Sequence, residues 1–292
     1  MNWGPSLRKY CPNCGRPVSL DASICAACGS TLTAESDAHS EAGIVDDSER
    51  IPARDMGEII SETFDLYRDN FKPFLIIAMA PQIFGVLASF TPTALSVVFS
   101  IVAVVVSVVA SGAAIVAVAQ VVSGLEIDLQ YCFSVALARS VNLIVAVIIL
   151  VMALIGAAVL ALIVVGIPLL FYLAVIWVFV AHAVILEKDS PILALGRSRL
   201  LVRGSWWRVF GILIVFVLIC IGLVIAVGIP ISLLSLVSDP AALLISPIAF
   251  AVIAPITYIG LTLLYFDLRV RKEGFTLTTL EDQMRRLRSK TQ

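Results

Sequence analysis

Three long stretches of the chain contain no lysine or arginine, and this spacing limits what the chain can fold into. They lie between Lys72 and Arg139, between Arg139 and Lys188, and between Arg208 and Arg269. They hold 66, 48 and 60 residues, counted as position differences less one. Each is overwhelmingly apolar, and a membrane-spanning helix needs roughly 20 apolar residues. Each stretch therefore accommodates one helical hairpin with a turn that carries no positive charge.

The placement of the charges also predicts an orientation. Loops rich in lysine and arginine stay in the cytoplasm, and all 20 such residues can be placed on one side of a membrane. The chain is 60% hydrophobic and 14% charged, whereas a soluble domain is nearer half apolar and a quarter charged. We expect an all-α polytopic membrane protein in a lipid bilayer, with cytoplasmic termini and about six transmembrane helices in three hairpins. The expected spans are about 74–91, 94–122, 141–165, 168–187, 208–229 and 241–267.

Glycine and proline mark where the hairpins turn. Residues 91–93 (TPT) are expected to close the first hairpin and residues 166–168 (GIP) the second, and residues 228–230 (GIP) should begin the third turn. Pro81 falls inside the first span, which it should kink.

An interfacial amphipathic helix is expected before each hairpin. Asp55 and Glu58 resemble a capping pair that opens the first one, and apolar residues then recur at helical spacing. Residues 136–140 (ALARS) and 194–198 (ALGRS) echo one another before the second and third hairpins. These features predict a unit of surface helix plus hairpin, used three times. For the first helix, packing on the cysteine-rich head is the alternative.

The head carries two Cys-x-x-Cys pairs, which suit tetrahedral Zn²⁺ with four sulfur ligands. A module of about thirty residues cannot build a sufficient hydrophobic core, so metal binding would supply its folding free energy. Two disulfides are the alternative, but they need an oxidising compartment. Because cysteine fills all four coordination positions, the zinc is expected to be structural. The predicted zinc ligands are Cys11, Cys14, Cys25 and Cys28.

The chain is expected to divide into four parts: a zinc ribbon, a disordered acidic linker, a six-span membrane domain and a basic cytoplasmic tail helix. Their residues are 1–30, 31–53, 54–274 and 275–292. The ribbon offers only Arg8, Lys9 and Arg16 against Asp21, so nucleic acid is not expected as a partner. A cytosolic protein that docks on the ribbon is the expected partner.

The segment before the fifth span combines arginine with tryptophan. Asp189 or Ser190 can cap a helix there, and Pro191 fits its first turn. Tryptophan favours the headgroup level, where arginine can contact lipid phosphate. Ordinary anchoring at the cytoplasmic surface explains the same pattern and is the simpler interpretation. The candidate residues for anionic-lipid contact are Arg197, Arg199, Arg203, Trp206, Trp207 and Arg208.

The last span ends in a dense run of charge. Asp267 and Arg271 are four residues apart and can pair on one helix face, and Gly274 is a natural helix stop. Residues 185–187 (ILE), 194–198, 201–204 (LVRG), 207–209 (WRV) and 265–274 (YFDLRVRKEG) together resemble the glycerophosphoryl diester phosphodiesterase membrane domain family, over residues 55–282. The resemblance implies a bacterial or archaeal cytoplasmic membrane. The chain has no room for that family's catalytic barrel of about 250 residues.

Polar residues inside the expected spans are few. His182, Gln82 and Gln120 are weak candidates, and hydrolysis of a diester would need an acid, a base and usually a metal. We therefore expect a non-enzymatic membrane scaffold or regulator that docks a partner through its zinc ribbon. The alternative is a transporter or lipid-handling protein for a small or phosphate-bearing ligand.

Overall fold

In the computed structural model of this chain, residues 9–10, 17–18, 53–161, 166–187 and 190–291 are described. The chain divides into two units, Met1–Arg50 and Ile51–Gln292. In the first unit, β1 (Lys9–Tyr10) and β2 (Pro17–Val18) pair antiparallel, with Lys9 opposite Val18. The four predicted zinc ligands and nearly all of the predicted linker lie outside the described residues.

The second unit is built from helices. Six helical segments among the described residues are long and apolar enough to cross a membrane, as predicted. They are α2 (Phe71–Ser89), α3 (Thr93–Val122), α5 (Ser140–Ala161), α6 (Gly166–Ile176) with α7 (Val180–His182) and the π-helical turn η2 (Ala183–Glu187), α9 (Trp206–Ser235) and α10 (Asp239–Glu273). The shorter helices are α1 (Met56–Asp69), α4 (Leu129–Ala138), α8 (Pro191–Val202) and α11 (Leu277–Thr291).

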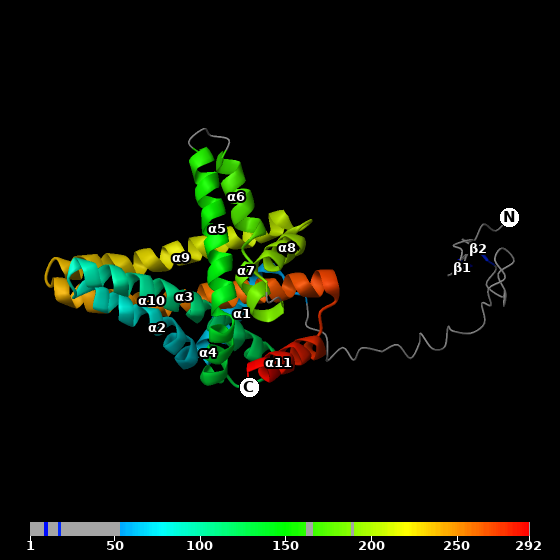
Figure 1. Ribbon diagram of the computed structural model, residues 1–292, viewed down its shortest axis with the longest axis horizontal. Helices are drawn as coiled ribbons and strands as arrows, with labels where there is room; N and C mark the ends of the chain where they lie inside the picture. The colour runs from blue at the N-terminus through cyan, green and yellow to red at the C-terminus, as the bar shows by residue number, and fades with distance from the viewer. Residues whose placement is uncertain (1–8, 11–16, 19–52, 162–165, 188–189, 292) are drawn as a thin grey trace. The chain divides into compact units, whose positions relative to one another are not determined.

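Consecutive long helices pack on one another: α2 on α3, α5 on α6, and α9 on α10. Helix α10 also contacts α2 and α3. Figure 1 shows α2, α3, α9 and α10 running alongside each other, whereas α5 and α6 stand at a steep angle to them. Consecutive spans are therefore neighbours, but the three pairs do not run parallel.

Much of the helical surface is apolar and exposed. Large apolar side chains point outward along α5 and α9, among them Ile148, Met152, Val217 and Leu218. Soluble monomers rarely expose apolar patches of more than a few hundred Å². This surface fits contact with lipid tails.

Two turn predictions are wrong. Helix α9 runs through Gly228 and Pro230 to Ser235, because the surrounding sequence stays apolar and proline is tolerated inside helices that cross lipid. The third turn lies at residues 236–238, before α10. Helix α6 begins at Gly166, which places Pro168 in its first turn, where the missing N–H costs no hydrogen bond.

The fourth span is interrupted, which the sequence analysis did not anticipate. Residues 177–179 form a turn between α6 and α7. The buried hydroxyl of Ser198 on α8 donates to the carbonyl of Ile176 at 2.7 Å and accepts from the amide of Phe179 at 3.2 Å. One side chain thus partners backbone groups on both sides of the break, which would otherwise be costly in an apolar setting.

Short helices α1, α4 and α8 precede the three pairs. The predicted Asp55–Glu58 capping box is present, with the Asp55 amide donating to Glu58 at 2.7 Å. Ser190 lies at the predicted N-cap position of α8 and is followed by Pro191, but its side chain makes no capping hydrogen bond. The five-residue echo, however, is not structurally equivalent: Arg139 caps the C-terminus of α4, whereas Arg197 lies inside α8.

Helix α1 packs on the long helices of its own unit. It contacts α10, and the hydroxyl of Tyr67 donates to the carbonyl of Val252 at 2.8 Å. Burial raises the pKa of Tyr67 to about 12, so this phenol stays a donor at neutral pH. The position of α1 at the membrane surface remains a prediction. Two exposed aromatic side chains could contact lipid there: Phe64 of α1, 39% exposed, and Phe71 at the start of α2, 40% exposed.

Gly260 lies where α10 crosses α9 and has no room for a side chain. A Cβ at this position would overlap the ring of Phe216, which is buried. We expect Gly260→Ala to displace that ring and destabilise the α9–α10 pair by about 1–3 kcal/mol, seen as a lower midpoint of thermal unfolding in detergent. Gly222→Ala on α9 is the control, because a Cβ there meets nothing within 4 Å. Equal midpoints for both variants would contradict the close approach.

Candidate functional site

One group of charged side chains in the second unit lies where α9 begins and α10 ends. Asp267 of α10 is fully buried. One carboxylate oxygen accepts from the backbone amide of Arg54 at 2.8 Å, and the other accepts from Nη2 of Arg208 at 3.0 Å. Nε of Arg271 lies 3.0 Å from both oxygens, so the predicted Asp267–Arg271 pair is present.

Arg54 links the same cluster to α1. Its carbonyl accepts from Arg208 at 2.6 Å and from Arg271 at 2.7 Å, and its guanidinium pairs with Glu62. Three guanidinium groups thus face two carboxylates. Nη1 of Arg54 and Nε of Arg208 are buried without a hydrogen-bond partner among the described residues. We call these five residues the Asp267 cluster: Arg54, Glu62, Arg208, Asp267 and Arg271.

A second cluster surrounds Glu187, whose side chain is 9% exposed. The Tyr265 hydroxyl donates to it, and Arg197 donates to its two oxygens at 2.6 and 3.1 Å. Arg197 also pairs with Glu273, and Arg269 lies 3.5 Å from Glu187 and 3.4 Å from Glu273. We call this set the Glu187 cluster: Glu187, Arg197, Tyr265, Arg269 and Glu273.

The Glu187 cluster is neutral, with two guanidiniums against two carboxylates. Burial alone would lower the pKa of Arg197, but its hydrogen bonds with Glu273 and Glu187 raise that pKa above its usual value. The Arg269 guanidinium also lies 3.7 Å from the ring centre of Phe275 and donates to Gln283 of α11 at 3.0 Å. The cluster therefore joins η2, α8 and α10 to the C-terminal helix.

The structure divides the six candidates for lipid contact. Arg197 and Arg208 are taken up by carboxylates in the two clusters, and Trp206 stacks on Phe210 with ring centres 4.9 Å apart. Trp207 is 78% exposed. Arg199 and Arg203 also have exposed side chains. Of the six candidates, Arg199, Arg203 and Trp207 are therefore the ones whose side chains are free to contact lipid headgroups.

His182 is packed rather than poised for chemistry. It is buried against the ring of Tyr265, with ring centres 5.2 Å apart. Among the described residues its one hydrogen-bond partner is the Thr262 hydroxyl, at 3.1 Å. A histidine acting as a general base needs a nucleophile or substrate within hydrogen-bond reach and a group that orients it. The Thr262 hydroxyl is within reach, but it donates to the carbonyl of Tyr258 at 2.6 Å. Among the described residues, no group orients the ring through Nδ1 of His182.

The sequence analysis did not predict that residues from several helices would form these two clusters. It noted Asp267 with Arg271 and placed Glu187 within a motif, but not the partners that other helices bring. The available signal was a carboxylate at the end of an apolar span, at Glu187 and at Asp267, because a charge at that depth has to be paired.

The residues that could bind a metal ion lie in the N-terminal segment with the two Cys-x-x-Cys pairs. Among the described residues, no group of three His, Cys, Asp or Glu side chains could hold a metal ion. Residues 10–32, which contain both Cys-x-x-Cys pairs, match the zinc-ribbon domain family.

No curated protein and no solved structure matches the chain. The resemblance of residues 55–282 to the glycerophosphoryl diester phosphodiesterase membrane domain therefore gains no support from these comparisons. The zinc-ribbon match and the six long apolar helices together fit a multi-pass membrane protein.

Proposed function

We propose that this chain is a non-enzymatic integral membrane protein that presents a zinc ribbon at the cytoplasmic surface, where the ribbon docks a protein partner. The observation that carries the proposal is the self-pairing of charge in the membrane unit. In the Asp267 and Glu187 clusters, arginines and carboxylates bind each other at the ends of the spans. Such clusters stabilise a fold, and because their charged groups are paired with one another, we assign the docking of a protein partner to the N-terminal unit.

The interior of the described spans supports this choice over a transporter. Transporters place polar or ionisable groups near the middle of the membrane, where substrate and ions bind. Apart from the two clusters, few buried polar residues lie in the described spans. They are Gln120, two residues from the end of α3, and the pair His182 and Thr262.

The same proposal includes two further points. Residues 55–282 resemble a bacterial or archaeal membrane domain, and the metal of the ribbon is zinc.

The zinc content of the purified protein tests the predicted metal site. We expect about one zinc ion per chain in the purified protein, since one four-cysteine site binds one ion. Cys14→Ser should lose it and leave the ribbon unfolded, because the metal supplies the folding free energy of such a module. Elemental analysis of the protein in detergent measures the ratio. Cys220→Ser, in α9, is the control and should keep the metal; a zinc-free wild type contradicts the assignment.

The cytoplasmic orientation of both termini is a further prediction. Reporter fusions at each end should give a fluorescent cytoplasmic reporter and an inactive secreted-type reporter, because the basic loops hold both termini inside. An active secreted-type reporter at the N-terminus would show that the ribbon faces the wrong compartment for the proposed partner. At the C-terminus, it would contradict the prediction that both ends of the chain are cytoplasmic.

The docking role is tested by crosslinking in cells. We expect a specific cytosolic protein to be recovered with the wild type and with Cys220→Ser, but at least roughly tenfold less with Cys25→Ser, since tenfold is about 1.4 kcal/mol of binding. The thermal midpoint of the membrane unit should be the same in all three proteins. Equal recovery from Cys25→Ser would refute docking through the ribbon.

A further inference from the structure

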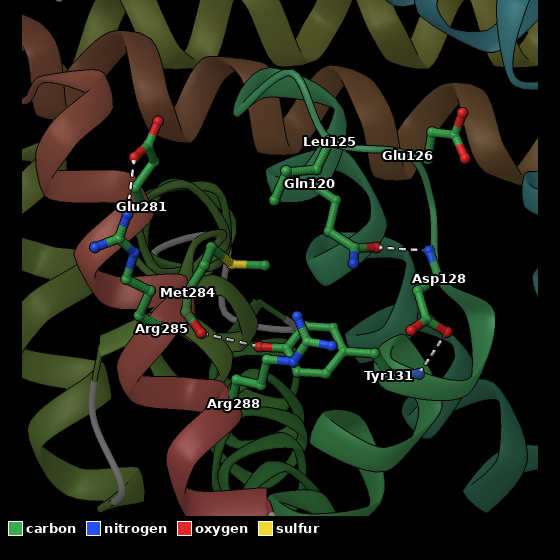
Figure 2. A pocket seen from close by; sticks show the side chains of 9 residues that line it. All are labelled: Gln120, Leu125, Glu126, Asp128, Tyr131, Glu281, Met284, Arg285 and Arg288. Carbon is green, nitrogen blue, oxygen red and sulfur yellow. Dashed lines mark hydrogen bonds and ion pairs between the residues drawn. The ribbon is translucent and has the colours of Figure 1, made fainter.

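A cavity of about 370 Å³ lies between α11 and the junction of α3 with α4. Figure 2 shows the side chains that line it, with Gln120, Tyr131, Met284 and Arg288 close to one another and Glu126 pointing away from them. The volume lies within the range of small-molecule sites, which is about 300–1,000 Å³. Neither ion-pair cluster contributes a residue to its lining, so the cavity is distinct from the site described above.

The walls of this cavity are held in place. Helix α11 buries Leu280, Met284 and Leu287 against the rest of the unit. The hydroxyl of Tyr131 on α4 donates to the carbonyl of Met284 at 3.1 Å. Burial raises the pKa of Tyr131, so this bond keeps its proton at neutral pH. The cavity does not depend on a loosely attached tail helix.

The cavity lies just beyond the end of a membrane span. Gln120 is two residues from Val122, the last residue of α3, and the rest of the lining follows in the α3–α4 connection, α4 and α11. In a bilayer this level is that of the lipid headgroups. A ligand could arrive either from the membrane or from the adjacent water.

Gln120 is buried, at 5% exposed, and one end of its amide is fixed by two donors. Its Oε1 accepts from the backbone amide of Asp128 at 3.2 Å and from the Cys132 thiol at 3.1 Å. Burial and then the charge of Asp128 raise the pKa of Cys132 to about 12, so the thiol keeps its proton and donates. A flipped amide would set its NH₂ group against the Asp128 N–H.

The NH₂ group of Gln120 therefore faces the cavity, as Figure 2 shows. No described residue accepts a hydrogen bond from it. Nε2 of Gln120 is not among the fully buried atoms that lack a partner, so it is accessible from the cavity, and an acceptor can reach it there. This side chain points to a ligand with an anionic or carbonyl oxygen.

Both positive charges that line the cavity come from α11. Helix α11 contributes Arg285 and Arg288, and the α3–α4 connection contributes Glu126 and Asp128 on the other side. Glu281 lies 3.8 Å from Arg285 and offsets it. Three carboxylates against two guanidiniums leave a net charge of −1.

This arrangement selects the ligand. A plain anion would meet the carboxylate of Asp128, and a plain cation would meet Arg288, whose guanidinium lies 5.9 Å from the ring centre of Tyr131. A zwitterion with its two charges a few bonds apart satisfies both walls. We propose that the cavity binds a phosphoethanolamine-type headgroup, with its phosphate at Gln120 and Arg288 and its ammonium at Asp128.

The inference does not depend on docking by the zinc ribbon. It gives a lipid-handling role a specific site, since such a headgroup belongs either to a membrane lipid or to a water-soluble phosphodiester released from one. Binding would also bridge α11 to the α3–α4 connection and strengthen the attachment of the tail helix.

The test uses the full chain in nanodiscs of phosphatidylcholine. In one arm the discs also carry phosphatidylethanolamine, and retained lipid is counted by native mass spectrometry. In the other arm soluble glycerophosphoethanolamine is titrated and its dissociation constant is measured by calorimetry. We expect specific binding in one arm, which names the source, or in both. Binding in neither arm overturns the proposal.

Variants locate the site. Arg288→Gln should weaken binding about tenfold or more, because it removes a charge-assisted hydrogen bond to the phosphate. Asp128→Asn should weaken it similarly while keeping the N-cap of α4, since asparagine caps as well as aspartate. Arg68→Gln, an exposed arginine on α1, is the control. Unchanged binding in Arg288→Gln, or equal binding of phosphatidylglycerol, which lacks the ammonium, overturns the assignment.

Discussion

Replacing Asp267 with asparagine is expected to destabilise the membrane unit by about 3 kcal/mol. The change keeps the shape of the side chain but removes the buried charge that Arg208 and Arg271 share. Breaking a buried ion pair costs about 3–5 kcal/mol, because the partner is left uncompensated. The arginine side chains are 31% and 34% exposed, so water screens them in part and the lower end of the range applies.

The measurement is the midpoint of thermal unfolding in detergent, compared with Asp239→Asn. Asp239 begins the same helix that Asp267 nearly ends, and its side chain is exposed. The control should match the wild type, whereas Asp267→Asn should fall several degrees below it. Replacing Arg208 by methionine in the Asp267→Asn background should recover part of the loss, since one of the excess cations is then gone. Matching midpoints for the two asparagine variants would mean that the cluster does not stabilise the fold.

The long helices could be predicted because hydropathy and charge are local properties of a chain. The span expected at 94–122 is α3, Thr93–Val122, and the N-cap at Asp55 and the C-cap at Gly274 are where local rules place them. The third turn was misplaced for the same reason. A Gly-Ile-Pro motif usually marks a turn in a soluble protein, but residues 228–230 lie in an apolar run where the helix continues.

The ion-pair clusters could not be predicted, because they join residues far apart in the sequence. Arg54 and Asp267 are 213 positions apart, and Arg197 and Glu273 are 76 apart. One sequence carries no signal for such distances. The arginines near Trp206 and Trp207 were therefore assigned to lipid, although Arg197 and Arg208 find carboxylates at the ends of other spans. The interruption at residues 177–179 escaped prediction likewise, since the hydroxyl that supports it comes from Ser198 on α8.

Glu187→Gln is expected to have a larger effect, about 4 kcal/mol. Glu187 receives hydrogen bonds from Arg197 and Tyr265 and lies beside Arg269. These two arginines are more buried than those around Asp267, at 19% and 5% exposed, so less water is present to screen the charge left behind. Glutamine can still accept from Tyr265, but the cluster passes from neutral to a net charge of +1.

A double variant separates the charge from the packing. Glu187→Gln with Arg197→Met restores neutrality, because Arg269 and Glu273 remain as a pair. Its unfolding midpoint should lie between those of the wild type and of Glu187→Gln, while Asp65→Asn, an exposed change on α1, should match the wild type. If the double variant is no more stable than Glu187→Gln alone, the uncompensated charge is not the cause. The cost would then come from the geometry of the carboxylate between η2, α8 and α10, which glutamine does not reproduce.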